Sequence, residues 1–208
     1  SGTLTRRANS AFGIILDANN SPTSSPAVAA GDKVYFACYS NAVKGYNAAG
    51  ALITWNSGGA NNDSFDFAGG TQGACTDGTY IYAIDQDNND DLFRRTIVGN
   101  VASTITMSQN IYGQAQNQGG FTIYHDGYIY IHTTGGADTI NKVNAATGAV
   151  TELTGCNVGS YSAGAILTQA VNGKFYIIEV GNGANENNII DLATFTRLTP
   201  ITCANLST

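Results

Sequence analysis

The sequence predicts an all-β fold built from four repeats, and two kinds of observation point to it. Short apolar runs alternate with turns rich in Gly, Asn and Asp along the chain, which is the pattern of β-strands joined by tight connections. The clearest stretch is 122–155, where strands are expected at Tyr128–Thr133, Thr139–Asn144 and Ala149–Leu153. The second observation is that this stretch recurs.

A motif at the start of a strand occurs four times at nearly constant spacing. Each copy places Gly beside Asp or Asn, just before an apolar strand that carries a tyrosine. These tyrosines are 47, 48 and 46 residues apart, at Tyr35, Tyr82, Tyr130 and Tyr176. A turn follows at 46–50 and 143–148, and more loosely at 190–194. A period of about 40 to 50 residues that holds about four strands indicates a β-propeller blade.

A short strand rich in small residues is expected before each repeat, at 26–30, 73–76, 120–124 and 163–171. Small side chains suit the crowded position beside a propeller axis. We therefore predict a four-bladed β-propeller with an N-terminal extension strand. The arm is 1–23, the propeller is 24–208, and its repeats are about 24–70, 71–118, 119–162 and 163–208.

The order of apolar strand, turn, Asn-Ala-Ala-Thr-Gly and apolar strand resembles the blades of YVTN-type and quinoprotein-like propellers. The resemblance covers about residues 24–202 and implies the propeller fold. It implies no single activity, because the same fold carries many functions. The second repeat departs from the pattern, since the acidic loop 85–91 replaces the usual short turn.

The composition argues against two classes of partner. The net charge is −6 and the nine Lys and Arg residues are scattered, whereas nucleic acid requires a basic patch. No apolar run approaches the ~20 residues of a membrane-spanning helix. Charged residues make up only 12% of the chain, so amides and hydroxyls must supply the polar surface. A low content of charged residues with many amides and hydroxyls is common in extracellular proteins. We therefore expect an extracellular or cell-surface location.

The four cysteines lack the CxxC spacing of zinc and redox sites. They lie at Cys38, Cys75, Cys156 and Cys203. We expect disulfides Cys38–Cys75 and Cys156–Cys203, because the members of each pair fall in neighbouring regions of the repeat arrangement. Such bonds stabilise a fold by about 2 to 4 kcal/mol each and form in oxidising compartments. The alternative is four buried free thiols that act as small apolar groups.

The acidic loop is the sharpest local feature. Alternating oxygen-bearing side chains there form a weak calcium candidate, made of Asp85, Asp87, Asn89 and Asp91. Calcium binds about 6 to 8 oxygen ligands, and the loop lacks the Gly and distal Glu of an EF-hand. The alternative is a solvated turn, for which Asp and Asn are favoured. We expect no other cofactor.

Two further sets of residues are candidates for contact with glycans. Asn-x-Ser/Thr sequences make Asn19, Asn62 and Asn205 glycosylation candidates. The single tryptophan, Trp55, is a candidate for stacking on a ligand, and the alternative is a buried apolar side chain. The chain has only two His and three Glu, which gives it little for acid–base chemistry. A propeller lyase or hydrolase is therefore the least favoured function, and we predict that the protein is not an enzyme.

The N-terminal arm lies outside the four predicted repeats. It holds an apolar strand whose side chains need burial, namely Phe12, Ile14, Ile15 and Leu16. This strand either closes the ring within the chain or is donated to a neighbouring subunit, a known mode of assembly. We predict a non-enzymatic extracellular structural or adhesive subunit that self-associates, including into fibres, through this strand. The alternative is a monomeric propeller that binds carbohydrate or peptide.

Overall fold

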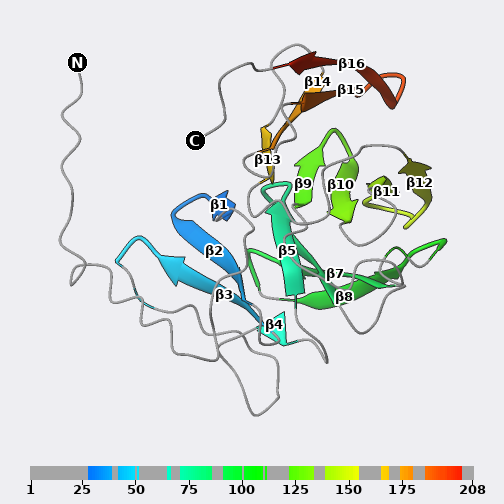
Figure 1. Ribbon diagram of the computed structural model, residues 1–208. Helices are drawn as coiled ribbons and strands as arrows, with labels where there is room; N and C mark the ends of the chain where they lie inside the picture. Colours follow the sequence, from blue (N-terminus) through cyan, green and yellow to red (C-terminus); the bar gives the residue numbers. More distant parts are fainter. Residues whose placement is uncertain are drawn as a thin grey trace, which may run out of the picture.

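The computed structural model describes residues 28–38, 42–49, 51, 65–66, 71–85, 91–99, 101–109, 111, 122–133, 139–154, 165–168, 174–179 and 186–202. Every regular element in these residues is a β-strand, which confirms the all-β prediction. The strands form four antiparallel sheets of four strands each (Figure 1). We name them the first to fourth sheet in chain order.

Each sheet is a meander whose strands pair in the order in which they occur in the chain. The first sheet contains β1 (Val28–Ala30), β2 (Lys33–Cys38), β3 (Ala42–Asn47) and β4 (Phe65–Asp66). The second contains β5 (Thr71–Thr76), β6 (Tyr80–Asp85), β7 (Asp91–Thr96) and β8 (Ala102–Thr106). The third contains β9 (Thr122–His125), β10 (Tyr128–Thr133), β11 (Thr139–Asn144) and β12 (Val150–Leu153). The fourth contains β13 (Ala165–Thr168), β14 (Lys174–Glu179), β15 (Glu186–Asp191) and β16 (Thr196–Thr202).

The predicted strands agree closely with these elements. β10 and β11 have the predicted bounds, and β12 begins one residue later than predicted. The repeated residues also occupy equivalent strands in the four sheets. The four repeated tyrosines all lie on the second strand of their sheet, where they pair in order with Gly45, Arg94, Lys142 and Ile189.

The sheets follow one another in chain order around a common centre, toward which β1, β5, β9 and β13 lie (Figure 1). β5 contacts both β1 and β2 on one side and β9 on the other, so the second sheet lies between the first and the third. Three apolar clusters accompany this order. They join the first sheet to the second, the second to the third, and the third to the fourth. Among the buried residues that the structure describes, no cluster joins the fourth sheet to the first.

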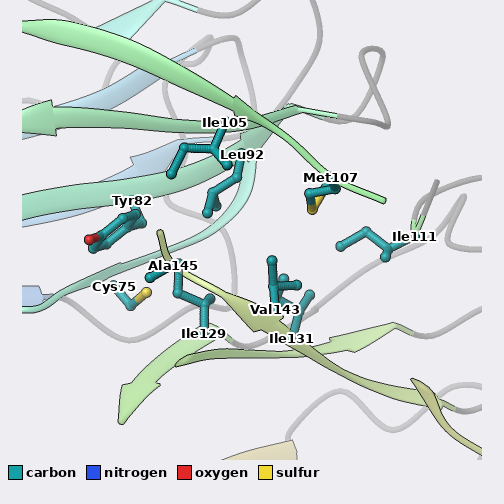
Figure 2. Packing of buried hydrophobic residues seen from close by; sticks show 10 residues of the cluster. All are labelled: Cys75, Tyr82, Leu92, Ile105, Met107, Ile111, Ile129, Ile131, Val143 and Ala145. Atoms are coloured by element: carbon teal, nitrogen blue, oxygen red, sulfur yellow. The ribbon is translucent and has the colours of Figure 1, made fainter. Parts of the chain in front are cut away.

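The largest cluster fills the interface between the second and third sheets (Figure 2). Tyr82, Leu92 and Ile105 come from the second sheet and face Ile129 and Val143 of the third. All five side chains are buried, because successive residues of a strand point to opposite faces and these face the neighbouring sheet. The core of the protein therefore lies between sheets.

The turn after the third strand is held in the same way in three sheets. In the third sheet, Oδ1 of Asn144 accepts hydrogen bonds from the backbone amides of Ala146 and Thr147, both at 2.9 Å. Asn47 of the first sheet and Asp191 of the fourth also accept two backbone amides through Oδ1. A short carboxyl or amide side chain that mimics a backbone turn explains why Asn and Asp recur at this point.

Candidate assembly surface

Each sheet has two lateral faces, which we name by direction along the chain. The forward face points toward the next sheet, and the backward face points toward the preceding one. On β6, Tyr80 and Tyr82 lie on the forward face, whereas Ile81 lies between them on the backward face. The same alternation holds on β10, where Tyr130 packs toward the fourth sheet and Ile129 toward the second. Neighbouring sheets pack against each other through these faces.

The forward face of the second sheet combines ring stacking with a hydrogen bond to a carboxylate. The Tyr82 ring stacks on Tyr124 of β9, with centroids 6.0 Å apart and planes at 3°. Its hydroxyl donates to Oδ2 of Asp77 at 2.8 Å. Oδ1 of Asp77 accepts the backbone amides of Thr79 and Tyr80, both at 2.7 Å, which fixes the carboxylate in the turn before β6.

Burial raises the pKa of two of the interface phenols above the ordinary value for tyrosine. The pKa of Tyr82 is raised by burial first, and by the hydrogen bond and charge of Asp77 next. Burial also raises the pKa of Tyr130 to about 12, with smaller contributions from Tyr128 and Asp126. Both phenols therefore stay protonated to a more alkaline pH than an exposed tyrosine does.

Two cations occupy equivalent places on consecutive forward faces. The Arg94 guanidinium carbon lies 4.7 Å from the ring centroid of Tyr80. Lys142, 48 residues later, places Nζ 4.2 Å from the centroid of Tyr128 and 5.6 Å from that of Phe195 in the fourth sheet. Each cation–π contact contributes about 0.5 to 1 kcal/mol at such partly exposed sites. The Lys142 contacts bridge the third and fourth sheets.

A close backbone contact adds to the interface of the second and third sheets. The backbone amide of Ser108, just after β8, donates to the carbonyl of Gly148 at 2.9 Å. The Ser108 hydroxyl accepts the backbone amide of Val150 at 2.9 Å. Gly148 has φ +74°, and an added Cβ would collide with the Thr106 carbonyl oxygen. Only glycine allows the turn of the third sheet to approach β8 this closely.

The backward face of the first sheet differs from the other backward faces. Val34 aligns with Ile81 and Ile129 in the repeat, one residue before the tyrosine in each case. Ile81 and Ile129 are both 0% exposed, because the forward face of the preceding sheet covers them. Val34 is 38% exposed, and Ala29, its partner on β1, is also exposed. Among the described residues, these two exposed side chains mark the candidate assembly surface.

Most of the residues singled out in the sequence lie outside the described residues. These include the whole apolar strand of the arm, the tryptophan and the three sequons, that is, Phe12, Ile14, Ile15, Leu16, Trp55, Asn19, Asn62 and Asn205. The N-terminal strand, the glycosylation sites and the stacking platform therefore stay predictions.

The cysteine pairings also stay predictions. Cys75 is a free thiol in the structure, and it is buried in the interface of the second and third sheets. Burial raises the pKa of this thiol, and the charge of Asp77 adds to the effect. Cys38 ends β2, but its side chain is not among those described, and Cys156 and Cys203 lie outside the described residues.

The calcium candidate is described at its two ends only. Asp85 ends β6 and Asp91 begins β7, while Asp87 and Asn89 lie outside the described residues. Oδ1 of Asp91 accepts a hydrogen bond from the Thr106 hydroxyl at 3.1 Å, across the β7–β8 pair. In the described part of the chain, no group of three or more His, Cys, Asp or Glu side chains could hold a metal ion. Nor is any helix there long and apolar enough to cross a membrane.

Sequence reasoning missed the residues that make the interfaces specific. Extending the 48-residue offset from the tyrosines would have aligned Arg94 with Lys142 and Tyr80 with Tyr128. The 47-residue offset between Tyr35 and Tyr82 would likewise have aligned Val34 with Ile81. The contrast in exposure between those two side chains had no signal in the sequence, because both are apolar.

The comparisons with known proteins agree on the fold. No family model matches the sequence, and no curated protein matches it. Hydrazine synthase of Kuenenia stuttgartiensis is structurally similar, with a TM-score of 0.61 and 10% identity over 92% of this chain and 52% of that chain. A protein of unknown function from Bacteroides thetaiotaomicron has a TM-score of 0.61 and 15% identity over 84% of this chain and 46% of that chain.

The WD40 domain of Neurospora crassa Pan2 is also similar, with a TM-score of 0.57 and 11% identity over 86% of this chain and 52% of that chain. WD40 repeats form β-propellers, so the sheets of this chain have a β-propeller-like arrangement. The chain spans about half the length of these solved chains. Identities this low support the fold and carry no activity with it.

Proposed function

We propose that the four sheets are four blades of a β-propeller and that residues 1–23 form an arm outside the blades. The equivalent positions of the repeated tyrosines support one blade for each repeat. The similar solved structures support a propeller arrangement. Each blade then presents one forward and one backward face to its neighbours.

We infer that the protein is a non-enzymatic, extracellular structural or adhesive subunit that works by assembly. The observation that carries this proposal is the exposed backward face of the first sheet. Val34 there is 38% exposed, whereas Ile81, its counterpart in the second sheet, is fully buried. In the described part of the chain, an apolar position that is buried in the second and third sheets is thus exposed in the first, as expected for a surface that a partner covers. The low content of charged residues, 12%, supports an extracellular location.

The arm supplies the means of linking subunits. Burying the side chains of Phe12, Ile14, Ile15 and Leu16 would contribute roughly 1.5 to 3 kcal/mol each. Addition of a donated strand to a neighbouring sheet would satisfy both these side chains and the backbone of the strand. The arm is therefore proposed to extend assemblies into oligomers or fibres.

Deletion of residues 1–20 tests this function. We expect the deleted protein to lose large oligomers and filaments in light scattering and electron microscopy, while it keeps a cooperative thermal transition. If the full-length protein forms no assemblies and the deletion unfolds it, the arm is an internal clasp. A monomeric propeller that binds carbohydrate or peptide then becomes the better account.

A further inference from the structure

The ammonium group of Lys142 lies among three aromatic rings that come from two sheets. Nζ is 4.2 Å from the ring centroid of Tyr128 and 6.0 Å from that of Tyr130, both on β10 of the same sheet. It is 5.6 Å from the centroid of Phe195, which lies in the turn between β15 and β16 of the fourth sheet. We call the rings of Tyr128, Tyr130 and Phe195 the aromatic cage.

The ring from the fourth sheet is held in place at a cost in backbone energy. Phe195 has φ +50°, a conformation that is unfavourable for a bulky residue. Such a conformation persists where the surrounding contacts determine it. The Phe195 ring contacts the Tyr130 ring, with centroids 5.9 Å apart, as well as the Lys142 amine. These contacts keep the third ring of the cage beside the amine.

Lys142 differs in its partners from the other two lysine side chains that the structure describes. Nζ of Lys33 pairs with Asp32 at 3.3 Å, and Nζ of Lys174 pairs with Asp191 at 3.2 Å. In the described part of the chain, the Lys142 amine makes no ion pair or hydrogen bond. Its N–H groups can therefore be replaced by methyl groups without loss of a hydrogen bond within the protein.

The equivalent position of the second sheet shows which kind of cation suits such a place. Arg94 lies 48 residues before Lys142, and its guanidinium carbon is 4.7 Å from the ring centroid of Tyr80. A guanidinium is more weakly hydrated than an ammonium, so it loses less when it packs against a ring. Methylation likewise replaces hydrated N–H groups of an ammonium and keeps its charge. Methylated ammonium groups are the cations that aromatic cages bind.

We propose that Lys142 is a site of lysine N-methylation and that the aromatic cage holds the methylated ammonium. The methyl donor is a sulfonium compound used by a methyltransferase. After the ammonium loses a proton, Nζ forms a bond to the methyl carbon, the carbon–sulfur bond breaks, and a neutral thioether leaves. The positive charge moves from sulfur to nitrogen, so the side chain stays cationic.

The modification would strengthen the contact between the third and fourth sheets, because the cage contains a ring from each. The Lys142 side chain is only half-buried, so it is accessible from solvent. The site lies in the repeats and does not depend on the N-terminal arm or on assembly of subunits.

Peptide mass spectrometry of the protein isolated from its natural source tests the modification. We expect one to three methyl groups on Lys142 in most chains. Lys33 and Lys174 are the internal controls, because their amines pair with carboxylates, and we expect them to be unmodified. An unmethylated Lys142 in this protein would overturn the proposal.

Chemical methylation tests the cage in full-length protein produced without the modification. Formaldehyde with a borane reductant dimethylates lysine amines, and the shift in Tm on methylation is measured separately for each variant. The Tm shift should be about 1 to 4 °C more positive for the unmodified sequence than for Lys142→Arg, which keeps the charge but does not react. Equal shifts in the two proteins would overturn the proposal.

Two ring variants show whether the aromatic cage is responsible. Tyr128→Leu removes the ring nearest to the Lys142 amine and should abolish the additional shift. Tyr80→Leu is the matched control, because Tyr80 lies in the equivalent place beside Arg94, and it should keep the additional shift. Far-UV circular dichroism establishes that each variant is folded. An additional shift that survives in Tyr128→Leu would show that the cage does not hold the methylated amine.

Discussion

The ring of Tyr82 lies parallel to the ring of Tyr124, with 6.0 Å between centroids, and the two residues belong to different sheets. Tyr82 lies on β6, near the middle of the second sheet, and Tyr124 lies on β9, at the edge of the third. The hydroxyl of Tyr82 is held at the same time by Asp77 of its own sheet. The Tyr82 side chain thus contacts both the turn before its own strand and the neighbouring sheet. Tyr82 is also one of the four repeated tyrosines.

Removing the Tyr82 hydroxyl tests the polar part of this contact. Tyr82→Phe keeps the ring but leaves Asp77 without its phenol donor, so we expect a loss of about 1.5 to 3 kcal/mol in the free energy of unfolding. Chemical denaturation measures it. Tyr80→Phe is the control, because it leaves the Tyr82–Asp77 bond in place. Equal losses in the two variants would contradict a special role for this bond.

Alkaline pH should destabilise the protein through Tyr130. Its pKa is raised from 10.0 to about 12 by burial, so the folded state holds the proton more tightly than the unfolded state. The stabilising contribution is complete below pH 10 and is lost as the pH rises toward about 12. Denaturation at a series of alkaline pH values should show this loss, and Tyr130→Phe should reduce it. An unchanged profile in the variant would count against the assignment.

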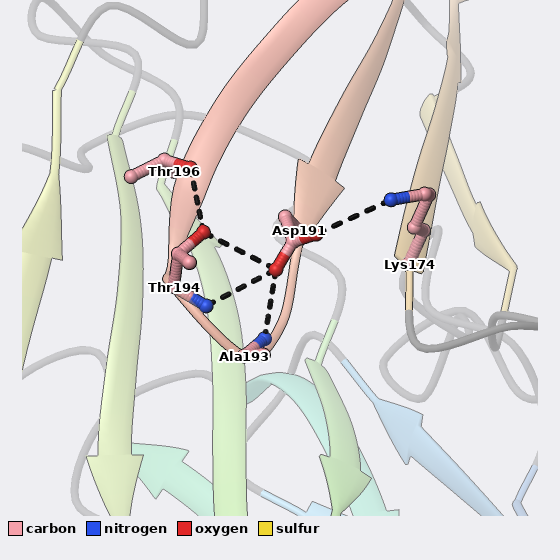
Figure 3. A network of polar contacts seen from close by, with 5 residues as sticks. All are labelled: Lys174, Asp191, Ala193, Thr194 and Thr196. Atoms are coloured by element: carbon pink, nitrogen blue, oxygen red, sulfur yellow. Dashed lines mark hydrogen bonds and ion pairs between the residues drawn. The ribbon is translucent and has the colours of Figure 1, made fainter.

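Acid should weaken the turn at Asp191 (Figure 3). The pKa of Asp191 is lowered by the backbone hydrogen bond from Thr194 first and by the bond from Lys174 next. Its contribution to stability is therefore present above the ordinary value of 3.8 and is lost as the pH falls through the lowered pKa.

The variant Asp191→Asn separates the two roles of this side chain. It keeps an oxygen for the backbone amides of Ala193 and Thr194 but removes the charge that pairs with Lys174 at 3.2 Å. We expect a small loss of stability at neutral pH and a weaker dependence on acid. Equilibrium denaturation at neutral pH and near pH 2 measures both. Acid dependence identical to that of the unmodified protein would contradict the assignment to Asp191.

Gly148→Ala should disturb the contact between the second and third sheets. Gly148 and Gly99 both have positive φ, +74° and +82°, so Ala is strained at either position. Only at Gly148 does the added Cβ collide with the Thr106 carbonyl oxygen, whereas nothing lies within 4 Å at Gly99. We expect Gly148→Ala to cost about 1 to 3 kcal/mol more than Gly99→Ala. Equal costs by thermal or chemical denaturation would show that the close approach is unimportant.

The repeat could be predicted from the sequence because residues close together in the chain specify its turns and strands. Gly beside Asp or Asn sets the turn before the second strand, and Asn or Asp caps the turn after the third, as at Asn144. Alternation of apolar and aromatic residues then fixes the strand between them. These features predicted the all-β class and the bounds of β10 and β11.

The packing between the lateral faces of the sheets could not be predicted from the sequence in the same way. Val34 and Ile81 have the same chemistry and the same place in the repeat, but Val34 is 38% exposed and Ile81 is 0% exposed. The cation–π contacts of Arg94 and Lys142 depend likewise on strand register and on neighbouring rings. Packing between sheets is a long-range property, so a motif within one repeat does not specify it.

The most direct test of the account is the mass of the unmodified full-length protein in solution, measured by sedimentation velocity over a wide concentration range. We predict that a species of at least two chains dominates well above the lowest concentrations, because association would cover the exposed side chains of Val34 and Ala29 on the first sheet. A single chain at every concentration would contradict it.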